Sequence, residues 1–153
     1  MRLITSVSAA LILGAGCVTL ATADTSPQNA IRYRQAVMGA LGGHTGAIMM
    51  INGGRVDQPK FLLPHAEALA SLGEQLSILF PAGSGAGKTD ALAKIWEDPA
   101  KFQKAVDAGT TATAKVRDAV KGGDKAAINQ ALKGLGDACK GCHDNFRKEE
   151  PKP

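Results

Sequence analysis

Apolar residues recur three and four positions apart along almost the whole chain after residue 24, and this spacing restricts the fold more than any other feature. It places the apolar side chains on one face of an α-helix. Ser26-Pro27 and Asp98-Pro99 each combine an N-cap residue with proline at the first helical position, which is typical of a helix start. No stretch alternates with period two for long enough to predict a strand. The pattern therefore predicts an all-α protein.

Four helices are expected, separated by clusters of glycine and proline. The first opens at Ser26-Pro27 and ends near Asn52-Gly53-Gly54. The second follows Asp57 and ends near Phe80, and Pro64 is expected to kink it or delay its start. The third opens at Asp98-Pro99, and the fourth is capped by Asp124 after Gly122-Gly123. Their apolar faces are Ile31, Arg34, Met38, Leu41, Thr45 and Ile48; Leu69, Leu72, Leu76 and Leu79; Phe102, Val106, Gly109, Thr113, Val116 and Val120; and Ile128, Leu132, Leu135, Cys139, Cys142 and Phe146. Four antiparallel helices with these faces form an up-and-down four-helix bundle. The longer connection is expected to hold a short helical turn around residues 91–96.

The first 23 residues have the pattern of a cleaved signal peptide. Met1 and Arg2 give a short basic start, Leu3 to Leu20 is apolar, and Ala21-Thr22-Ala23 has the A-x-A form of a cleavage site. A membrane anchor and a lipoprotein cut before Cys17 are the alternatives. The sequence thus divides into a signal at residues 1–23 and a domain at residues 24–153, which works outside the cytoplasm and is not integral to the membrane.

Composition limits the partners of this domain. The formal charge of the whole chain is +4, and acidic and basic residues alternate through its second half without a block of one sign. One Trp, one Tyr and four Phe are too few for an aromatic platform that stacks single-stranded nucleic acid. Nucleic acid is therefore not an expected partner.

The segment Cys139-Lys140-Gly141-Cys142-His143 has the C-x-x-C-H pattern of covalent haem attachment. On a helix, the two thiols and the imidazole fall on one face, so the thiols can bond the two vinyl groups of one porphyrin while His143 binds the iron. A redox disulfide would need a βαβ context, and a zinc site would need further ligands. The pattern predicts one haem c held by two thioethers, and the porphyrin would fill the core of a chain with few aromatics.

The second axial position has several candidates on the first two helices: Met38, Met49, Met50, His44 and His65. Only Met38 lies on the apolar face of the first helix, but a methionine there is also ordinary core filling. The sequence leaves open whether its sulfur bonds the iron or packs beside it.

The first helix also carries four glycines and an arginine at unusual places. Gly39, Gly42, Gly43 and Gly46 each weaken the helix, so they predict either a smooth surface for a porphyrin edge or a neighbouring helix, or a local distortion. Arg34 is expected at the end of the bundle, paired with a haem propionate or solvated. Arg147 follows His143 by four residues. It is expected either over the face of the haem that His143 binds or simply in the last turn of the helix.

Residues 82–89, which end in Gly87-Lys88-Thr89, match a relaxed phosphate-binding loop. That loop requires a buried strand before it and a parallel sheet, whereas here an amphipathic helix closed by Pro81 precedes it. We expect a flexible glycine-rich connection.

These motifs resemble the class II c-type cytochromes, which comprise cytochrome c′ and its low-spin relatives. The resemblance covers nearly all of residues 24–153 and rests on Cys139–Arg147, which reads C-x-x-C-H-D-x-[FY]-R, on Tyr33-Arg34-Gln35 and on Ile95-Trp96. It implies haem contacts for Arg34, Gln35 and Asp90, a distal position for Met38, a periplasmic location and a homodimer through the first two helices.

Two functions follow from the resemblance. Residues 37–44 are more similar to the low-spin members, so the first expectation is an electron carrier with His143 and Met38 as axial ligands and redox proteins as partners. The alternative is a cytochrome c′-type protein whose five-coordinate iron binds nitric oxide or carbon monoxide. An enzyme is not expected, because no pair of acid and base residues supports one.

Overall fold

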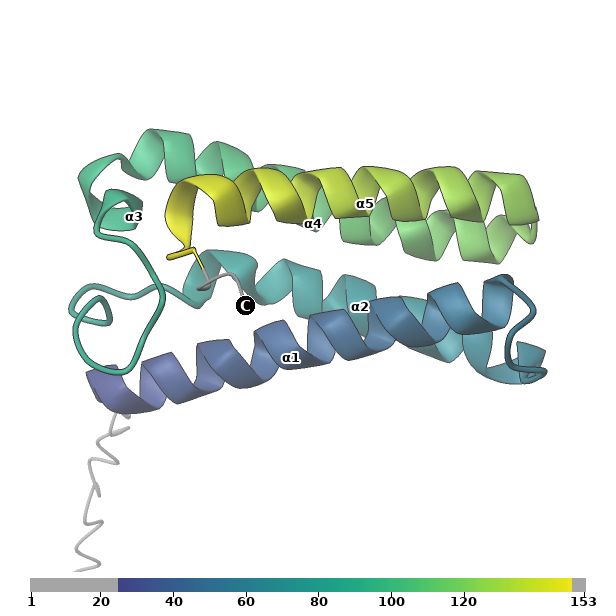
Figure 1. The fold of residues 1–153 in the computed structure, drawn as a ribbon, viewed down its shortest axis with the longest axis horizontal. Coiled ribbons are helices and arrows are strands. Elements are labelled where there is room, and N and C mark those ends of the chain that lie inside the picture. The colour runs from purple at the N-terminus through teal and green to yellow at the C-terminus, as the bar shows by residue number, and fades with distance from the viewer. Residues whose placement is uncertain (1–24, 150–153) are drawn as a thin grey trace, which may run out of the picture.

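The chain folds into an antiparallel four-helix bundle, as the apolar spacing predicts. The computed structural model describes residues 25–149, so the predicted signal peptide at residues 1–23 lies outside the described residues. The helices are α1 (Pro27–Asn52), η1 (Pro59–Phe61), α2 (Leu62–Glu74), η2 (Gln75–Ile78), α3 (Lys94–Glu97), α4 (Pro99–Gly122) and α5 (Lys125–Phe146). In Figure 1, α1 and α2 form one layer and α4 and α5 form the other. Among residues 25–149, no helix combines the length and apolar character that a membrane span needs.

The helices begin where the capping residues predict. The Ser26 hydroxyl accepts a hydrogen bond from the Asn29 N–H, and the Asp98 carboxylate accepts one from the Lys101 N–H at 3.0 Å. The Asp124 carboxylate accepts from the N–H groups of residues 126 and 127. Gly123 ends α4 with a φ of 74°, a left-handed conformation that glycine adopts without a Cβ clash.

Two expected boundaries differ from the structure. The second helix was expected to run to about Phe80, but α2 ends at Glu74 and the chain continues as the 3₁₀ turn η2, a common way for a helix to tighten at its end. The short turn in the long connection is α3, which spans Lys94–Glu97 and so lies a few residues later than expected.

Close packing joins three of the four pairs of neighbouring helices. α4 packs extensively against α5, α2 against α4, and α1 against α2, whereas α1 and α5 make few contacts. At the α2–α4 contact a Cβ added to Gly73 would come within 2.0 Å of the Thr113 hydroxyl oxygen, so glycine permits the approach. The buried core forms two separate clusters: Ile48, Ala66, Leu69, Ala112, Val116, Val120, Ile128 and Leu135 in one, and Ile95, Phe102, Val106 and Phe146 in the other.

Candidate functional site

The C-x-x-C-H segment forms the last two turns of α5. Both cysteines are free thiols; Cys142 is half-buried and packs against the second core cluster, while Cys139 and His143 lie at exposed positions. The helical spacing of residues 139, 142 and 143 gathers two sulfurs and one imidazole on neighbouring positions of one helix. This donor set suits two thioethers and one axial ligand to haem iron.

The surroundings shift the pKa of each of these three groups toward its uncharged form. Partial burial raises the pKa of the Cys139 thiol, although its own backbone hydrogen bond opposes the shift. Burial is also the main cause that raises the pKa of Cys142, and the neighbouring Cys139 adds to it. Burial lowers the pKa of His143, the charge of Arg147 lowers it further, and Asp144 raises it. A neutral imidazole has the free lone pair that a metal ligand needs.

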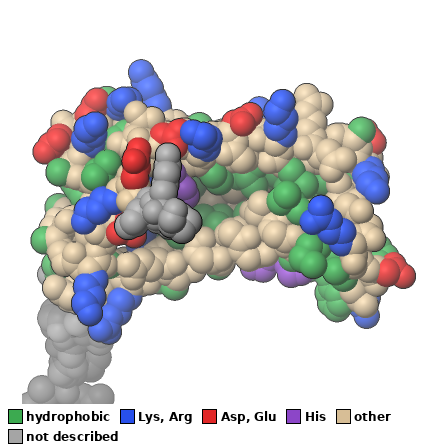
Figure 2. Space-filling model, in the orientation of Figure 1, with side chains coloured by type: hydrophobic (Ala, Val, Ile, Leu, Met, Phe, Trp, Pro, Cys, Tyr) green, Lys and Arg blue, Asp and Glu red, His purple; other side chains and the backbone are tan. Residues whose placement is uncertain are grey.

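The four glycines in the middle of α1 have no packed neighbours. A Cβ added to Gly39, Gly42, Gly43 or Gly46 would meet nothing within 4 Å. Met38, half-buried on the same helix, precedes these glycines. Figure 2 shows hydrophobic side chains in a furrow between the layer of α1 and α2 and the layer of α4 and α5. A flat apolar group attached to α5 can lie in this furrow, so the residues present fit a haem.

A cavity of about 270 Å³ opens beside the His143 imidazole, at the end of α5. It is lined by His143, Asp144, Arg147, Lys148 and Glu149. Residues of both charges therefore line this cavity together with His143. Arg147 belongs to this lining, in agreement with its effect on the pKa of His143.

Of the two expectations for Arg34, the structure excludes the solvated one. Its side chain is buried, with 4% of its surface exposed, so it is not a solvated residue at a helix end. One terminal nitrogen donates to the Leu79 carbonyl at 3.2 Å and the Ser84 hydroxyl at 3.0 Å. The other donates to the Ser84 carbonyl at 3.0 Å and the Thr89 hydroxyl at 2.7 Å, and the guanidinium lies 4.7 Å from the Phe80 ring centroid. These four bonds use the terminal N–H groups, so bidentate pairing with a propionate would require breaking some of them.

The hydrogen bonds of Arg34 to Ser84 and Thr89 hold the glycine-rich connection in place. Ser84 is fully buried, and its hydroxyl also donates to the Pro81 carbonyl at 2.8 Å. Gly83 and Gly87 have φ values of 82° and 112°, which explains the need for glycine at these turns. The expectation of a loose connection therefore fails at Ser84 and Thr89. The 3₁₀ turn η2, and no strand, lies before this segment in the described chain, in agreement with the rejection of a phosphate-binding loop.

The other two predicted contact residues also lie along this connection. The Gln35 side-chain amide donates to the Lys88 carbonyl at 3.0 Å. The Asp90 carbonyl accepts from the Lys148 N–H at 2.8 Å, while the Asp90 carboxylate lies at an exposed position. With the isolated bridge between Ala91 and Arg147, this bond places the connection beside the end of α5. Contact of Arg34, Gln35 and Asp90 with haem stays a prediction.

Ser84 and Thr89 were not among the residues predicted from the sequence. Both stand in a segment whose composition suggests an exposed loop, and their partner Arg34 is 50 and 55 positions away. The one available signal was Arg34 itself, because a charge on the apolar face of a helix requires buried acceptors.

The chain is similar to one family throughout the described bundle. A family model described as cytochrome c′ matches residues 29–147. The cytochrome c′ of Pararhodospirillum photometricum is 35% identical over 124 residues, which cover 80% of this chain and 99% of that protein. The structure of cytochrome c′ from Shewanella frigidimarina has a TM-score of 0.75 at 35% identity, covering 81% of this chain and 98% of that one.

Two further similar structures carry diatomic ligands. Both are variants of cytochrome c′ from Alcaligenes xylosoxidans, each 28% identical to this chain with a TM-score of 0.74, covering 81% of this chain and 98% of that one. One is a nitric oxide complex of a leucine-to-isoleucine variant, and the other is a leucine-to-glycine variant with bound carbon monoxide.

These similarities overturn the expected electron carrier with His143 and Met38 as axial ligands. The relatives that match most of the chain are cytochromes c′, for which the resemblance implies five-coordinate iron, and structures of such proteins hold nitric oxide or carbon monoxide. A methionine bonded to the sixth position would occupy the place where such a gas binds. The similarity of residues 37–44 to low-spin members was therefore a misleading signal.

Proposed function

The chain belongs to the cytochrome c′ family, and from this premise we propose that it binds nitric oxide and carbon monoxide at the open face of a five-coordinate haem iron. The observation that carries the proposal is the position of the C-x-x-C-H segment on α5, which makes few contacts with α1, beside the apolar furrow between the two layers. Haem, when bound, supplies an iron with one free coordination position.

The residues of α5 hold the haem in this proposal. Cys139 and Cys142 form the two thioethers, and His143 binds the iron on the near face. The lowered pKa of His143 favours its neutral form, whose lone pair is available to a metal. The described chain has one such segment, so we propose one haem c for each chain.

In this proposal Met38 lies beside the opposite face of the iron. It is half-buried on α1, four residues after Arg34, whose hydrogen bonds fix this part of the helix against the 79–89 segment. A flexible thioether side chain can narrow the space for a ligand without bonding the metal. The size and shape of the side chain at position 38 would then determine the affinity of the iron for a gas.

Replacing Met38 by alanine is expected to strengthen carbon monoxide binding by about tenfold, because relieving steric crowding of about 1–3 kcal/mol changes an equilibrium by that order. The measurement is a carbon monoxide titration of the ferrous protein, followed by its absorption spectrum. Met49, which is 56% exposed, gives a matched control, and Met49→Ala should leave the affinity unchanged. An affinity that Met38→Ala leaves unchanged would remove Met38 from the gas site.

We also propose a periplasmic location, which the signal-like residues 1–23 support. The proposed activity is ligand binding and involves no catalytic turnover.

A further inference from the structure

Two histidines that take no part in the haem site meet between α1 and α2. The Nδ1 atoms of His44 and His65 lie 2.9 Å apart, and the two ring centroids are 5.1 Å apart with the planes inclined by 58°. Both side chains are half-buried, and each stands on a regular helix. Figure 2 shows histidine atoms reaching the surface along the edge of the molecule formed by α1 and α2.

The hydrogen bond between the rings requires different tautomers. One ring carries its proton on Nδ1 and donates it, while the other accepts at an unprotonated Nδ1. If the donating ring moves its proton to Nε2, both Nδ1 lone pairs become free on atoms that lie 2.9 Å apart. The pair can therefore take up a metal ion without a net loss of protons.

The distance between the two nitrogens matches neighbouring ligands of one metal. With metal–nitrogen bonds of about 2.0–2.1 Å, a separation of 2.9 Å corresponds to an angle of about 90° at the metal. This angle suits the tetragonal geometry of Cu²⁺ better than the wider tetrahedral angle of Zn²⁺, and imidazole binds Cu²⁺ more strongly than other divalent metals of the first transition row.

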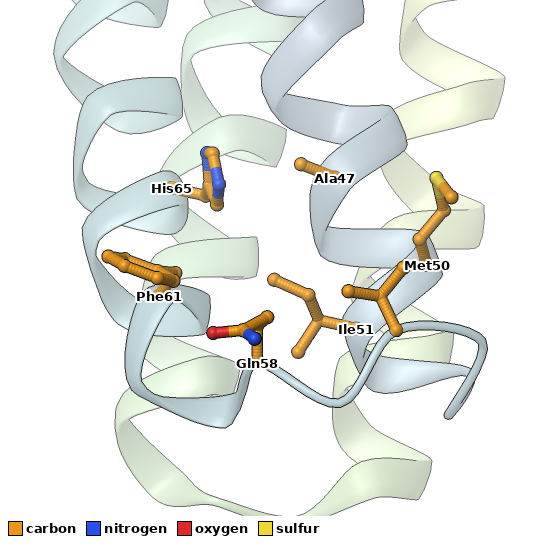
Figure 3. A pocket seen from close by; sticks show the side chains of 7 residues that line it. Ala47, Met50, Ile51, Gln58, Phe61 and His65 are labelled. Atoms are coloured by element: carbon orange, nitrogen blue, oxygen red, sulfur yellow. The ribbon is translucent and has the colours of Figure 1, made fainter.

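Space for further ligands lies directly beside His65. A pocket of about 210 Å³ is lined by Ala47, Met50, Ile51, Val56, Gln58, Phe61 and His65. A water molecule takes about 30 Å³ of liquid volume, so the pocket has room for coordinated water, with Gln58 and His65 as its polar lining residues. In Figure 3 the Gln58 amide lies across the pocket from His65, where it can hydrogen-bond to such a water.

From this geometry we propose that His44 and His65 form a surface site for one Cu²⁺ ion, with water completing the coordination. The site rests on two helices that pack extensively against each other, so its two ligands are held in place before the metal arrives. The chain has three histidines, and the third, His143, belongs to the haem site on α5. The copper proposal does not depend on which gas the haem binds.

The test is a titration of the ferric haem-containing protein with Cu²⁺ in a weakly coordinating buffer, followed by electron paramagnetic resonance of the copper. We expect one Cu²⁺ bound per chain with splitting from two imidazole nitrogens. Loss of even a residue that only orients a ligand typically weakens metal binding roughly 10–100-fold, so His44→Ala and His65→Ala should each weaken it by at least about tenfold.

Two controls make this test decisive. Lys60, exposed on η1 near the pocket, gives a variant (Lys60→Ala) that should bind Cu²⁺ as the wild type does. The double variant of His44 and His65 measures copper bound elsewhere, such as at the terminal amine. If an alanine variant does not fold, His44→Gln and His65→Gln keep a polar side chain in its place. Equal binding by the wild type and the double variant, or a copper spectrum without imidazole nitrogen, would overturn the proposal.

Discussion

Replacing both Cys139 and Cys142 by alanine is expected to abolish covalent attachment of haem. The two thiols stand one helical turn apart on α5 and are the only cysteines among the described residues, so no other thiol there could form a thioether. Either single variant should keep one thioether, and its haem should remain on the chain with a shifted absorption band. The measurement is haem staining of the denatured polypeptide together with its pyridine haemochrome spectrum.

Lys140→Ala is the matched control, because Lys140 lies between the two cysteines and its side chain is exposed and paired with Asp144. It should keep both thioethers and the wild-type haemochrome spectrum. Haem that stays covalently bound to the double alanine variant would show that the attachment site lies elsewhere. A wild-type chain exported and folded with zinc or a disulfide at these cysteines would contradict the haem assignment.

Replacing Arg34 by alanine is expected to lower the free energy of unfolding by about 3 kcal/mol, because hydrogen bonds to a charged group each contribute about 1.5–3 kcal/mol and do not add fully. The substitution removes four hydrogen bonds to residues 79–89 and leaves the oxygens of the buried Ser84 and Thr89 short of partners. Urea unfolding of the ferric haem-containing protein measures the loss. Hydrogen exchange in residues 81–92 should increase at the same time.

Arg32 provides the control for this substitution, since it lies two residues away on α1 and is exposed. Arg32→Ala should change the stability by less than about 0.5 kcal/mol. Arg34→Lys keeps the charge but not the planar fork that reaches several acceptors, so its stability should fall between the wild type and Arg34→Ala. If Arg34→Ala unfolds at the same urea concentration as the wild type, the guanidinium does not hold the connection.

The helices could be predicted because their signals are local. Ser26, Asp98 and Asp124 cap the helices that they were expected to cap, and Ile48, Val116 and Ile128, predicted on apolar faces, are among the most buried side chains. Capping depends on neighbouring residues and apolar spacing on one helix, so both can be recognised in a sequence. The C-x-x-C-H segment is equally local, which is why the haem site could be predicted.

Contacts between distant segments could not be predicted from the sequence. The hydrogen bonds of Arg34 connect α1 to residues 50 and 55 positions later, and no periodicity encodes such a pairing. In the sequence, His44 and His65 were separate candidates for an iron ligand. Only the fold brings their Nδ1 atoms to 2.9 Å from each other. The coordination of Met38 was wrongly predicted because a methionine that bonds iron and one that packs beside it occupy the same helical position.

The most direct test of the central claim, a haem iron with an open face, is the absorption spectrum of the purified protein, ferric and ferrous, before and after carbon monoxide. We expect broad high-spin ferric and ferrous spectra and a clear shift of the ferrous spectrum when the gas is added. Sharp ferrous low-spin bands, a far-red ferric band from methionine bonded to iron, and no response to carbon monoxide would contradict it.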